Sequence, residues 1–366
     1  MPQIQEKFDA VKMKESIVRW VSEARTHYQP RFDMVDEFVK RYEAKRSISG
    51  LMGWGDDPKA NPKNKPWDNA SDIGIPIEAF TIEGLLPRFL KVCYGAKPIV
   101  WVKGQTEDDF QQADVVQEAL NFQLTKKIKI YRRMKLCFKN TVMNGDGIVK
   151  CVWEEEKKII NKVVYYVIDP TTGQPLIDEQ GNPIQVGKDD EVPPVNPQTG
   201  QAQAKIRQIL SEPKTVYDSP KVYSRNIKQI VIPKDADTSE IQELDWVADQ
   251  YERTIDWIKK RIGDTDEGMF DEKAVIDLEG EVTKNLLGAE RFNPGFQKAV
   301  ITEWHGGYDV NDDGLKEEIV VFIGSKDLNT SFDIPSSIQN SKLLGWMITP
   351  YPIRPFFHYQ IIPRDG

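Results

Sequence analysis

The sequence is poor in the residues and runs on which several classes of protein depend. Its 366 residues include only three cysteines and three histidines, and no Cys-x-x-Cys pair occurs. The odd number and wide spacing of the cysteines predict buried free thiols in a reducing compartment, and the histidines do not cluster with them as a zinc site requires. No run of about 18 apolar residues is present, so we expect no transmembrane helix. The N-terminal residues mix charges and lack an apolar core, so we expect no signal peptide.

Motifs of the common enzymes are missing as well. There is no Gly-x-x-x-x-Gly-Lys-Ser/Thr loop, which an ATP-driven motor uses to hold phosphates, and no Gly-x-Ser-x-Gly or Cys–His nucleophile pattern. The nearest enzyme-like pattern is Asp146, a predicted strand, and then Glu155-Glu156-Lys157. It imitates metal-dependent nucleases, in which two carboxylates hold magnesium and a lysine polarises the attacking water. Because 29% of the residues are charged, such spacing arises easily by chance, and a strand that ends in solvent is the favoured interpretation.

An excess of positive charge is also absent. Lysine and arginine number 49 against 57 aspartates and glutamates, which gives a net charge of -8 at pH 7. A protein that grips DNA tightly usually carries a basic excess. We therefore expect any contact with nucleic acid to be local, or to let DNA pass rather than hold it.

What the sequence does contain is a mixture of helical and strand patterns. Apolar residues at helical spacing predict amphipathic helices at about 17–28 and 35–45, and a capping box at Thr106 predicts a third that runs, with a break, to about Asn144. Further helices are predicted at 239–247, 254–262 and 273–287. Predicted strands cover 148–153, 163–168 and 221–233, and a hairpin pairs 299–304 with 317–323.

The order of these elements predicts an α+β fold. Helices and strands do not alternate as βαβ units, so we expect N-terminal helices and a helix-rich body with antiparallel β-hairpins. Composition divides the chain into five segments: N-terminal amphipathic helices (1–50), a helical core with the first strands (51–168), a Pro/Gly-rich hairpin insertion (169–220), a strand with helices (221–297), and a β-hairpin with an acidic turn and a further strand (298–366).

The best-patterned stretch of the chain, residues 66–102, has no catalytic group at its centre. A polar turn leads into a long apolar helix whose large side chains need a partner surface. The candidate interface residues are Trp67, Ile75, Phe80, Leu85 and Phe89. A chain that uses this segment for packing is expected to be part of an assembly rather than an enzyme.

The densest basic run lies in the third predicted helix. On one continuous helix Lys126, Lys129 and Arg133 would share a face, which makes them candidates for DNA contact. The other cations of the run point to a second face. A solvated helix with subunit or intrahelical ion pairs is the alternative.

The acidic turn of the predicted hairpin resembles part of a calcium loop. Asp309, Asn311, Asp313 and Glu317 stand at positions 1, 3, 5 and 9, and a glycine stands at position 6. Position 12 is Val320, where an EF-hand has glutamate, and the flanks are strands. The alternatives are a bound Ca²⁺ and an acidic turn closed by Asx-type hydrogen bonds.

Four features occur along the chain in a characteristic order. The first is the Pro-Trp-Asp-Asn-Ala-Ser-Asp turn at 66–72, which is followed by Gly-Ile-Pro and by a helix ending near Pro87-Arg88. The second is the helix pair 113–147, closed by Asn-Gly-Asp-Gly. The third is the hairpin 303–314, and the fourth is the Pro-Tyr-Pro…Pro-Phe-Phe run at 350–357. Together they resemble the portal (head-to-tail connector) protein of tailed bacteriophages, of the large short-tailed-phage type.

The resemblance implies a structural protein and not an enzyme. Portal subunits form a ring, usually of twelve, at one capsid vertex, and DNA enters and leaves through its bore. The implied partners are further copies of the chain, the terminase, the major capsid and scaffolding proteins, tail adaptor proteins and the double-stranded DNA, with no membrane. The implied location is the virion, and the host cytoplasm during assembly.

In the terms of that family the chain corresponds to the wing. Its last strand leads toward the place where the first stem helix would begin, and stem, clip and crown have no counterpart. A phage adaptor protein that forms no channel, and the metal-dependent nuclease, remain as alternatives.

Overall fold

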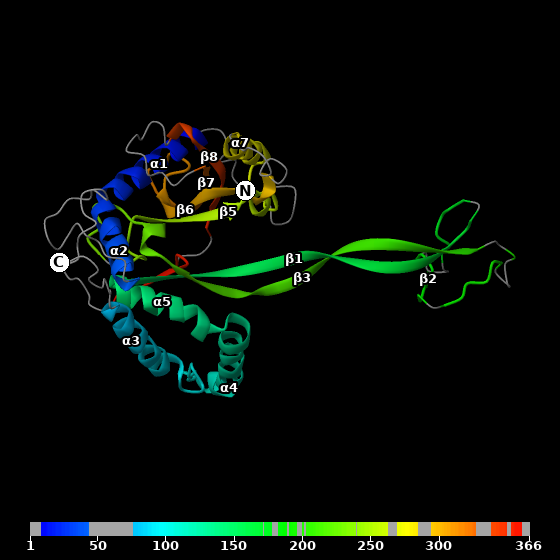
Figure 1. Ribbon diagram of the computed structural model, residues 1–366, viewed down its shortest axis with the longest axis horizontal. Coiled ribbons are helices and arrows are strands. Elements are labelled where there is room, and N and C mark those ends of the chain that lie inside the picture. The colour runs from blue at the N-terminus through cyan, green and yellow to red at the C-terminus, as the bar shows by residue number, and fades with distance from the viewer. Residues whose placement is uncertain are drawn as a thin grey trace, which may run out of the picture. The chain divides into compact units, whose positions relative to one another are not determined.

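The computed structural model describes residues 9–43, 76–170, 172–177, 182–188, 190–195, 200, 203–238, 240–262, 269–284, 294–326, 338–349 and 353–360. The chain forms two compact units, which we call the body (Met1–Cys151 and Val222–Gly366) and the ribbon (Val152–Lys221). Helices and antiparallel strands are mixed, as Figure 1 shows, which confirms the predicted α+β class. Among the described helices, none is both long and apolar enough to cross a membrane.

A five-stranded antiparallel sheet forms the centre of the body. Its order is β4 (Ile230–Val231), β5 (Trp246–Thr254), β6 (Lys298–Tyr308), β7 (Glu317–Ser325) and β8 (Ser341–Ile348). The predicted hairpin is confirmed by β6 and β7, which pair from Val300 opposite Ser325 to Tyr308 opposite Glu317. The middle strands are buried along most of their length because other elements cover both faces of the sheet.

Alternate residues of β6 belong to two different cores. On one face Trp304 packs with Met13, Ile17 and Val21 of α1 (Ala10–His27). On the other face Ile301 packs against the short helix α6 (Ile255–Lys259) and against α7 (Glu272–Thr283). The strand period of two thus places odd and even residues of one strand in separate apolar clusters.

A helical layer makes up the rest of the body. Helix α2 (Gln29–Tyr42) and α3 (Ile77–Tyr94) precede α4 (Glu107–Phe122), the π-helical turn η1 (Gln123–Ile128) and α5 (Ile130–Asn144). Helix α3 buries Ile82, Leu86 and Leu90 at i, i+4 and i+8 and lies along α5 (Figure 1). The predicted break in the third helix is present at Lys129, whose φ of 56° is left-handed.

The ribbon consists of two long strands and a loop-rich tip. Strand β1 (Asp146–Ile168) and β3 (Ala204–Arg225) run alongside each other, and the short β2 (Gln185–Val186) pairs with β1. The sequence suggested two separate strands at 148–153 and 163–168 and an insertion that begins at 169. One continuous strand, β1, instead covers residues 148–153 and 163–168. The charged residues between them lie where both faces of the two-stranded ribbon are open to solvent, so this part of the strand needs no alternation of apolar and polar residues.

The helix predicted at 239–247 is wrong. Residues 240–245 form turns, and β5 begins at Trp246. Ile241 and Leu244 are buried at helical spacing, but they pack beneath the sheet with Phe356 of β9 (Phe356–Gln360). The apolar residues at the start of β5 follow Ile241 and Leu244 directly in the sequence, and a short apolar run of this kind cannot be separated from a helix by periodicity alone.

Candidate functional site

A buried group of charges joins the base of the long hairpin to the sheet of the body. Lys150 of β1 and Arg225 of β3 belong to the hairpin strands, while Asp249 of β5 and Glu303 of β6 belong to the sheet. Each of these four side chains is at most 10% exposed. We call the four, with Tyr251 and His305 added, the buried charge cluster; all of its members lie in the body.

The cluster is closely paired. Lys150 Nζ lies 3.0 Å from Asp249 Oδ2 and 2.5 Å from Glu303 Oε2, and Arg225 Nη2 lies 2.8 Å from Asp249 Oδ2. The Tyr251 hydroxyl donates to Glu303 Oε2 at 2.9 Å, and His305 Nε2 lies 2.8 Å from Glu303 Oε1. Each sheet carboxylate therefore faces a cation of the hairpin, so the charges fix the register between hairpin base and sheet.

The charge state of Glu303 follows from these contacts. Burial acts to raise the pKa of the carboxyl, but the Lys150 ammonium and the hydrogen bond and charge of His305 outweigh it and hold the pKa well below its usual range. Burial and the neighbouring Glu303 and Asp249 charges raise the pKa of Tyr251, so its hydroxyl stays a donor. Burial raises the pKa of Asp249, while the Lys150 and Arg225 charges act to lower it.

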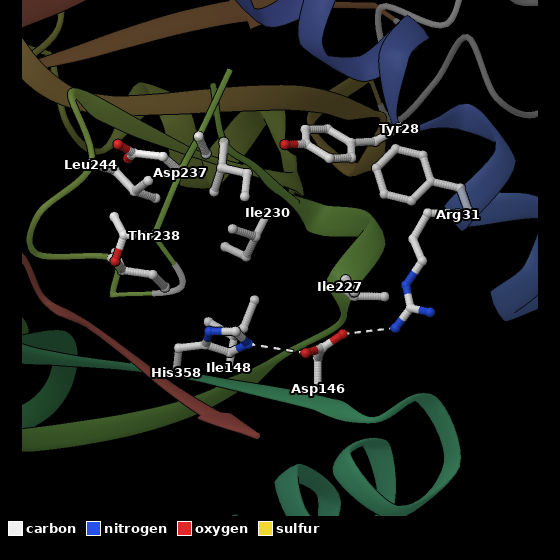
Figure 2. A pocket seen from close by; sticks show the side chains of 14 residues that line it. Tyr28, Arg31, Asp146, Ile148, Ile227, Ile230, Asp237, Thr238, Leu244 and His358 are labelled. Carbon is white, nitrogen blue, oxygen red and sulfur yellow. Dashed lines mark hydrogen bonds and ion pairs between the residues drawn. The ribbon is translucent and has the colours of Figure 1, made fainter. Parts of the chain in front are cut away.

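A pocket of about 630 Å³ lies beside the start of β1. Its wall is mostly apolar, with Phe32, Ile148, Ile230 and Leu244 among the lining residues, and Figure 2 shows Asp146 at one side between Arg31 and His358. Tyr28, Asp237 and Thr238 also line the pocket, away from Asp146 (Figure 2).

The polar side of this pocket is an ion-paired group of three. Arg31 Nη2 is 2.8 Å from Asp146 Oδ2, and His358 Nε2 is 3.2 Å from Asp146 Oδ1. Burial acts to raise the pKa of Asp146, but His358 and Arg31 outweigh it and the pKa is lowered. The group ties α2 and β9 to the first residue of β1.

The carboxylate that the nuclease pattern requires as a metal ligand is therefore engaged elsewhere. Asp146 pairs with two cationic side chains, and Glu155 Oε1 accepts from the Thr215 hydroxyl at 3.2 Å. Among the described residues no group of three or more His, Cys, Asp and Glu side chains is placed to hold a metal ion.

The acidic turn is closed by its own backbone. Asp309 accepts from the backbone N–H of Asp313 at 3.2 Å and of Gly314 at 2.9 Å, and Asn311 accepts from Asp313 N–H at 3.1 Å. Glu317 Oε2 accepts from Val310 N–H at 2.9 Å. These are the Asx-type bonds of the alternative interpretation, and a calcium ion would compete with them for the same oxygens.

The candidate DNA contacts are exposed but do not share a continuous helix. Lys126 lies in η1, Lys129 is the left-handed junction, and Arg133 lies in α5. The premise that the three lie on one unbroken helical face is wrong, because the junction at Lys129 turns the chain. Their role in DNA contact stays a prediction.

The candidate interface residues are partly described. Trp67 and Ile75 lie outside the described residues. Phe80 is 70% exposed, while Leu85 and Phe89 are 36% and 40% exposed and flank the buried row of α3. Their exposure leaves apolar surface that an assembly partner would cover.

Sequence reasoning missed the buried charge cluster. Its signals were present: Lys150 interrupts an apolar strand, and Asp249 directly follows the apolar residues Trp246, Val247 and Ala248. A lone charge in a buried strand requires an opposite charge nearby, because an unpaired buried charge is strongly unfavourable. Pairing the two would have required knowledge of the sheet topology.

The body is therefore a mixed α+β unit in which buried ion pairs join the hairpin strands to the sheet. A family model described as "Phage SU10 portal protein" matches residues 57–352. The chain belongs to this family of phage portal proteins. No match was found among curated proteins.

Proposed function

We propose that this chain is a portal subunit of the short-tailed-phage type that assembles, as one of about twelve copies, into a ring at one capsid vertex. The single observation that carries the proposal is the family match, which covers most of the chain and most of the body's sheet and helices. In this role the ring is the conduit for packaging by the terminase and for ejection of the DNA. Major capsid, scaffolding and tail adaptor proteins are its other partners.

The buried charge cluster suits a mechanical role. Ion pairs that are shielded from solvent are screened little by salt, and they hold one geometry because alternatives would leave a charge unpaired. Lys150 and Arg225 would therefore keep the base of the hairpin fixed while DNA passes. The cluster therefore favours a role as a rigid part of an assembly over a role as a passive adaptor.

Net charge also agrees with passage. Each phosphate that a protein neutralises adds a salt-dependent contribution to binding, and roughly six to ten contacts change affinity by about 10³–10⁵ over a modest salt range. A conduit must avoid such traps. A net charge of -8 repels the DNA backbone at long range.

Immunogold labelling of purified virions tests the proposal. A portal subunit places gold at a single capsid vertex, and loss of the protein yields heads without packaged DNA. Gold along a tail or over the whole shell would instead favour an adaptor or shell protein. Magnesium-dependent cutting of DNA by the purified chain, abolished in Glu155→Gln, would favour the nuclease.

We also propose that the acidic turn at residues 309–317 binds a calcium ion. Isothermal titration of the chain with CaCl₂ would release or absorb heat, and Asp309→Asn would abolish that heat. Absence of heat at millimolar CaCl₂ would contradict calcium binding, and the turn would then be explained by its Asx-type hydrogen bonds alone.

A further inference from the structure

Helix α4 has an outer face that nothing in the described part of the chain covers. Gln117 and Asn121 point inward and bond the backbone of the preceding segment: Gln117 Oε1 accepts from Val102 N–H at 3.0 Å, and Asn121 Oδ1 accepts from Ile99 N–H at 2.7 Å. On the opposite side lie Val115, 69% exposed, and Phe122, 52% exposed. The helix has no fully buried residue among those whose side chains are described.

Acidic side chains border this apolar strip. Asp114 and Glu118 precede Phe122 at i and i+4 in the same row of the helix, and both are exposed. Neither forms an ion pair with a described residue. We call Asp114, Val115, Glu118 and Phe122 the acidic face.

The neighbouring helix of the same layer has a face of opposite charge. Arg132, Lys135 and Leu136 lie on the side of α5 away from its buried row of Met134 and Cys137. Leu136 is 54% exposed. Neither Arg132 nor Lys135 forms an ion pair with a described residue. We call Arg132, Lys135 and Leu136 the basic face; the exposed Lys126, Lys127 and Lys129 precede it at the η1 turn.

The two faces match in composition. The acidic face has Val115 and Phe122 beside its acidic side chains, and the basic face has Leu136 beside its basic ones, so the charges are of opposite sign. Because they are different surfaces of one chain, their docking is head-to-tail, which is the type of contact that closes a ring. Like charges would oppose the isologous alternative, in which each face meets its own copy.

We propose that the acidic face of one copy binds the basic face of the next copy. The proposal rests on the proposed function and deepens it, since it names the surfaces through which neighbouring subunits meet. The rival occupant of the basic face is double-stranded DNA. The presence of the matching acidic and apolar face on the same layer favours a second copy.

A charge-swap experiment tests this contact. Variant one carries Arg132→Glu and Lys135→Glu; variant two carries Asp114→Lys and Glu118→Lys. Each replaces one attractive face by a repulsive one, so each alone should associate at least about tenfold more weakly than wild type in sedimentation velocity. An equimolar mixture should recover association, because every contact between unlike variants is again between opposite charges.

The matched control is Lys12→Glu with Lys273→Glu. Both lysines are exposed, lie in the first turn of α1 and of α7, and form no ion pair with a described residue. A glutamate at those positions suits the helix N-terminus. The control makes the same change of net charge as variant one and should associate like wild type. Wild-type association should also weaken as salt rises, because the paired charges are exposed at the edge of the contact.

Three results would overturn the contact. They are a wild-type chain that stays monomeric at all concentrations, single variants that associate like wild type, and a mixture that does not recover. Loss of duplex-DNA binding in variant one with unchanged self-association would assign the basic face to DNA. If the single variants still assemble into particles with a central hole, the contact fails while the portal role stands; if wild type places no gold at a single vertex, the portal role itself fails.

Discussion

Replacing Lys150 by methionine should destabilise the body more than any other single change of charge. Lys150 is the cation shared by Asp249 and Glu303, at 3.0 Å and 2.5 Å, and its ammonium also lies over the rings of Tyr251 and Phe356, at 5.3 Å and 5.2 Å from their centroids. Methionine keeps most of the length of the side chain and removes the ammonium group, with its charge and its hydrogen bonds to Asp249 and Glu303. Arg225 still faces Asp249, and His305 still faces Glu303.

The magnitude follows from the loss of one partner of a buried pair. Such a loss costs about 3–5 kcal/mol, because a carboxylate is left without its counter-charge in a poorly polarisable interior. Lys298→Met is the matched control, since Lys298 pairs with Glu252 at 3.1 Å and both side chains are more than half exposed. An exposed pair of this kind contributes about 0–1 kcal/mol.

The assay is urea unfolding of the full chain, followed by tryptophan fluorescence. Among the described residues, five tryptophans lie in or beside the sheet of the body, at positions 20, 246, 257, 304 and 346. The Lys150 variant should lower the free energy of unfolding by about 3–5 kcal/mol. Adding Glu303→Gln to Lys150→Met should recover part of the loss, because the carboxylate that Lys150 leaves unpaired is then neutral. Equal effects of Lys150→Met and Lys298→Met would refute the reasoning.

Three further predictions concern other parts of the body. Asp146→Asn should lower the free energy of unfolding by about 1–2 kcal/mol at neutral pH. Because the folded pKa of Asp146 is lowered, the stabilisation by its carboxylate is present above about pH 4 and is lost as pH falls. Denaturation at several pH values should therefore show the stabilities of wild type and variant converging in acid. Gly145→Ala should lower the unfolding free energy by about 1–2 kcal/mol, because φ is 87° at this helix C-cap, and an unchanged midpoint in urea would contradict it. Leu86→Ala should cost about 2–5 kcal/mol and Phe80→Ala far less, since Leu86 is 1% exposed and Phe80 70%; thermal unfolding compares the two.

Sequence patterns predicted the elements that have one buried face. The N-terminal helices, α3 and α7 were visible as period-3.6 patterns, because one side of each packs and the other meets solvent. The β6–β7 hairpin is buried on both faces, and it was predicted from its two apolar runs on either side of an acidic turn. Two other elements with equivalent faces were not. Strand β5 is buried on both sides and was not predicted, and its first two residues were assigned to the helix at 239–247. The charged middle of β1 is exposed on both sides and was taken for a gap between two strands.

The polar sites show the same limit. The Asx bonding of the acidic turn was foreseen as an alternative, since its residues are neighbours in the sequence. The buried charge cluster joins residues from four strands, with about 150 residues between Lys150 and Glu303, so its pairing depends on topology. Likewise, one left-handed residue at Lys129 redirects the basic run, and although a break in this helix was predicted, its position at Lys129 was not.

Electron cryomicroscopy of the assembled protein is the most direct test of whether identical copies of this chain form a ring around a hollow axis, as proposed for a member of this portal family. We expect ring-shaped particles with rotational symmetry and an axial opening, in which α4 of each copy contacts α5 of the next. A lone particle, or a closed assembly without an opening on its axis, would contradict it.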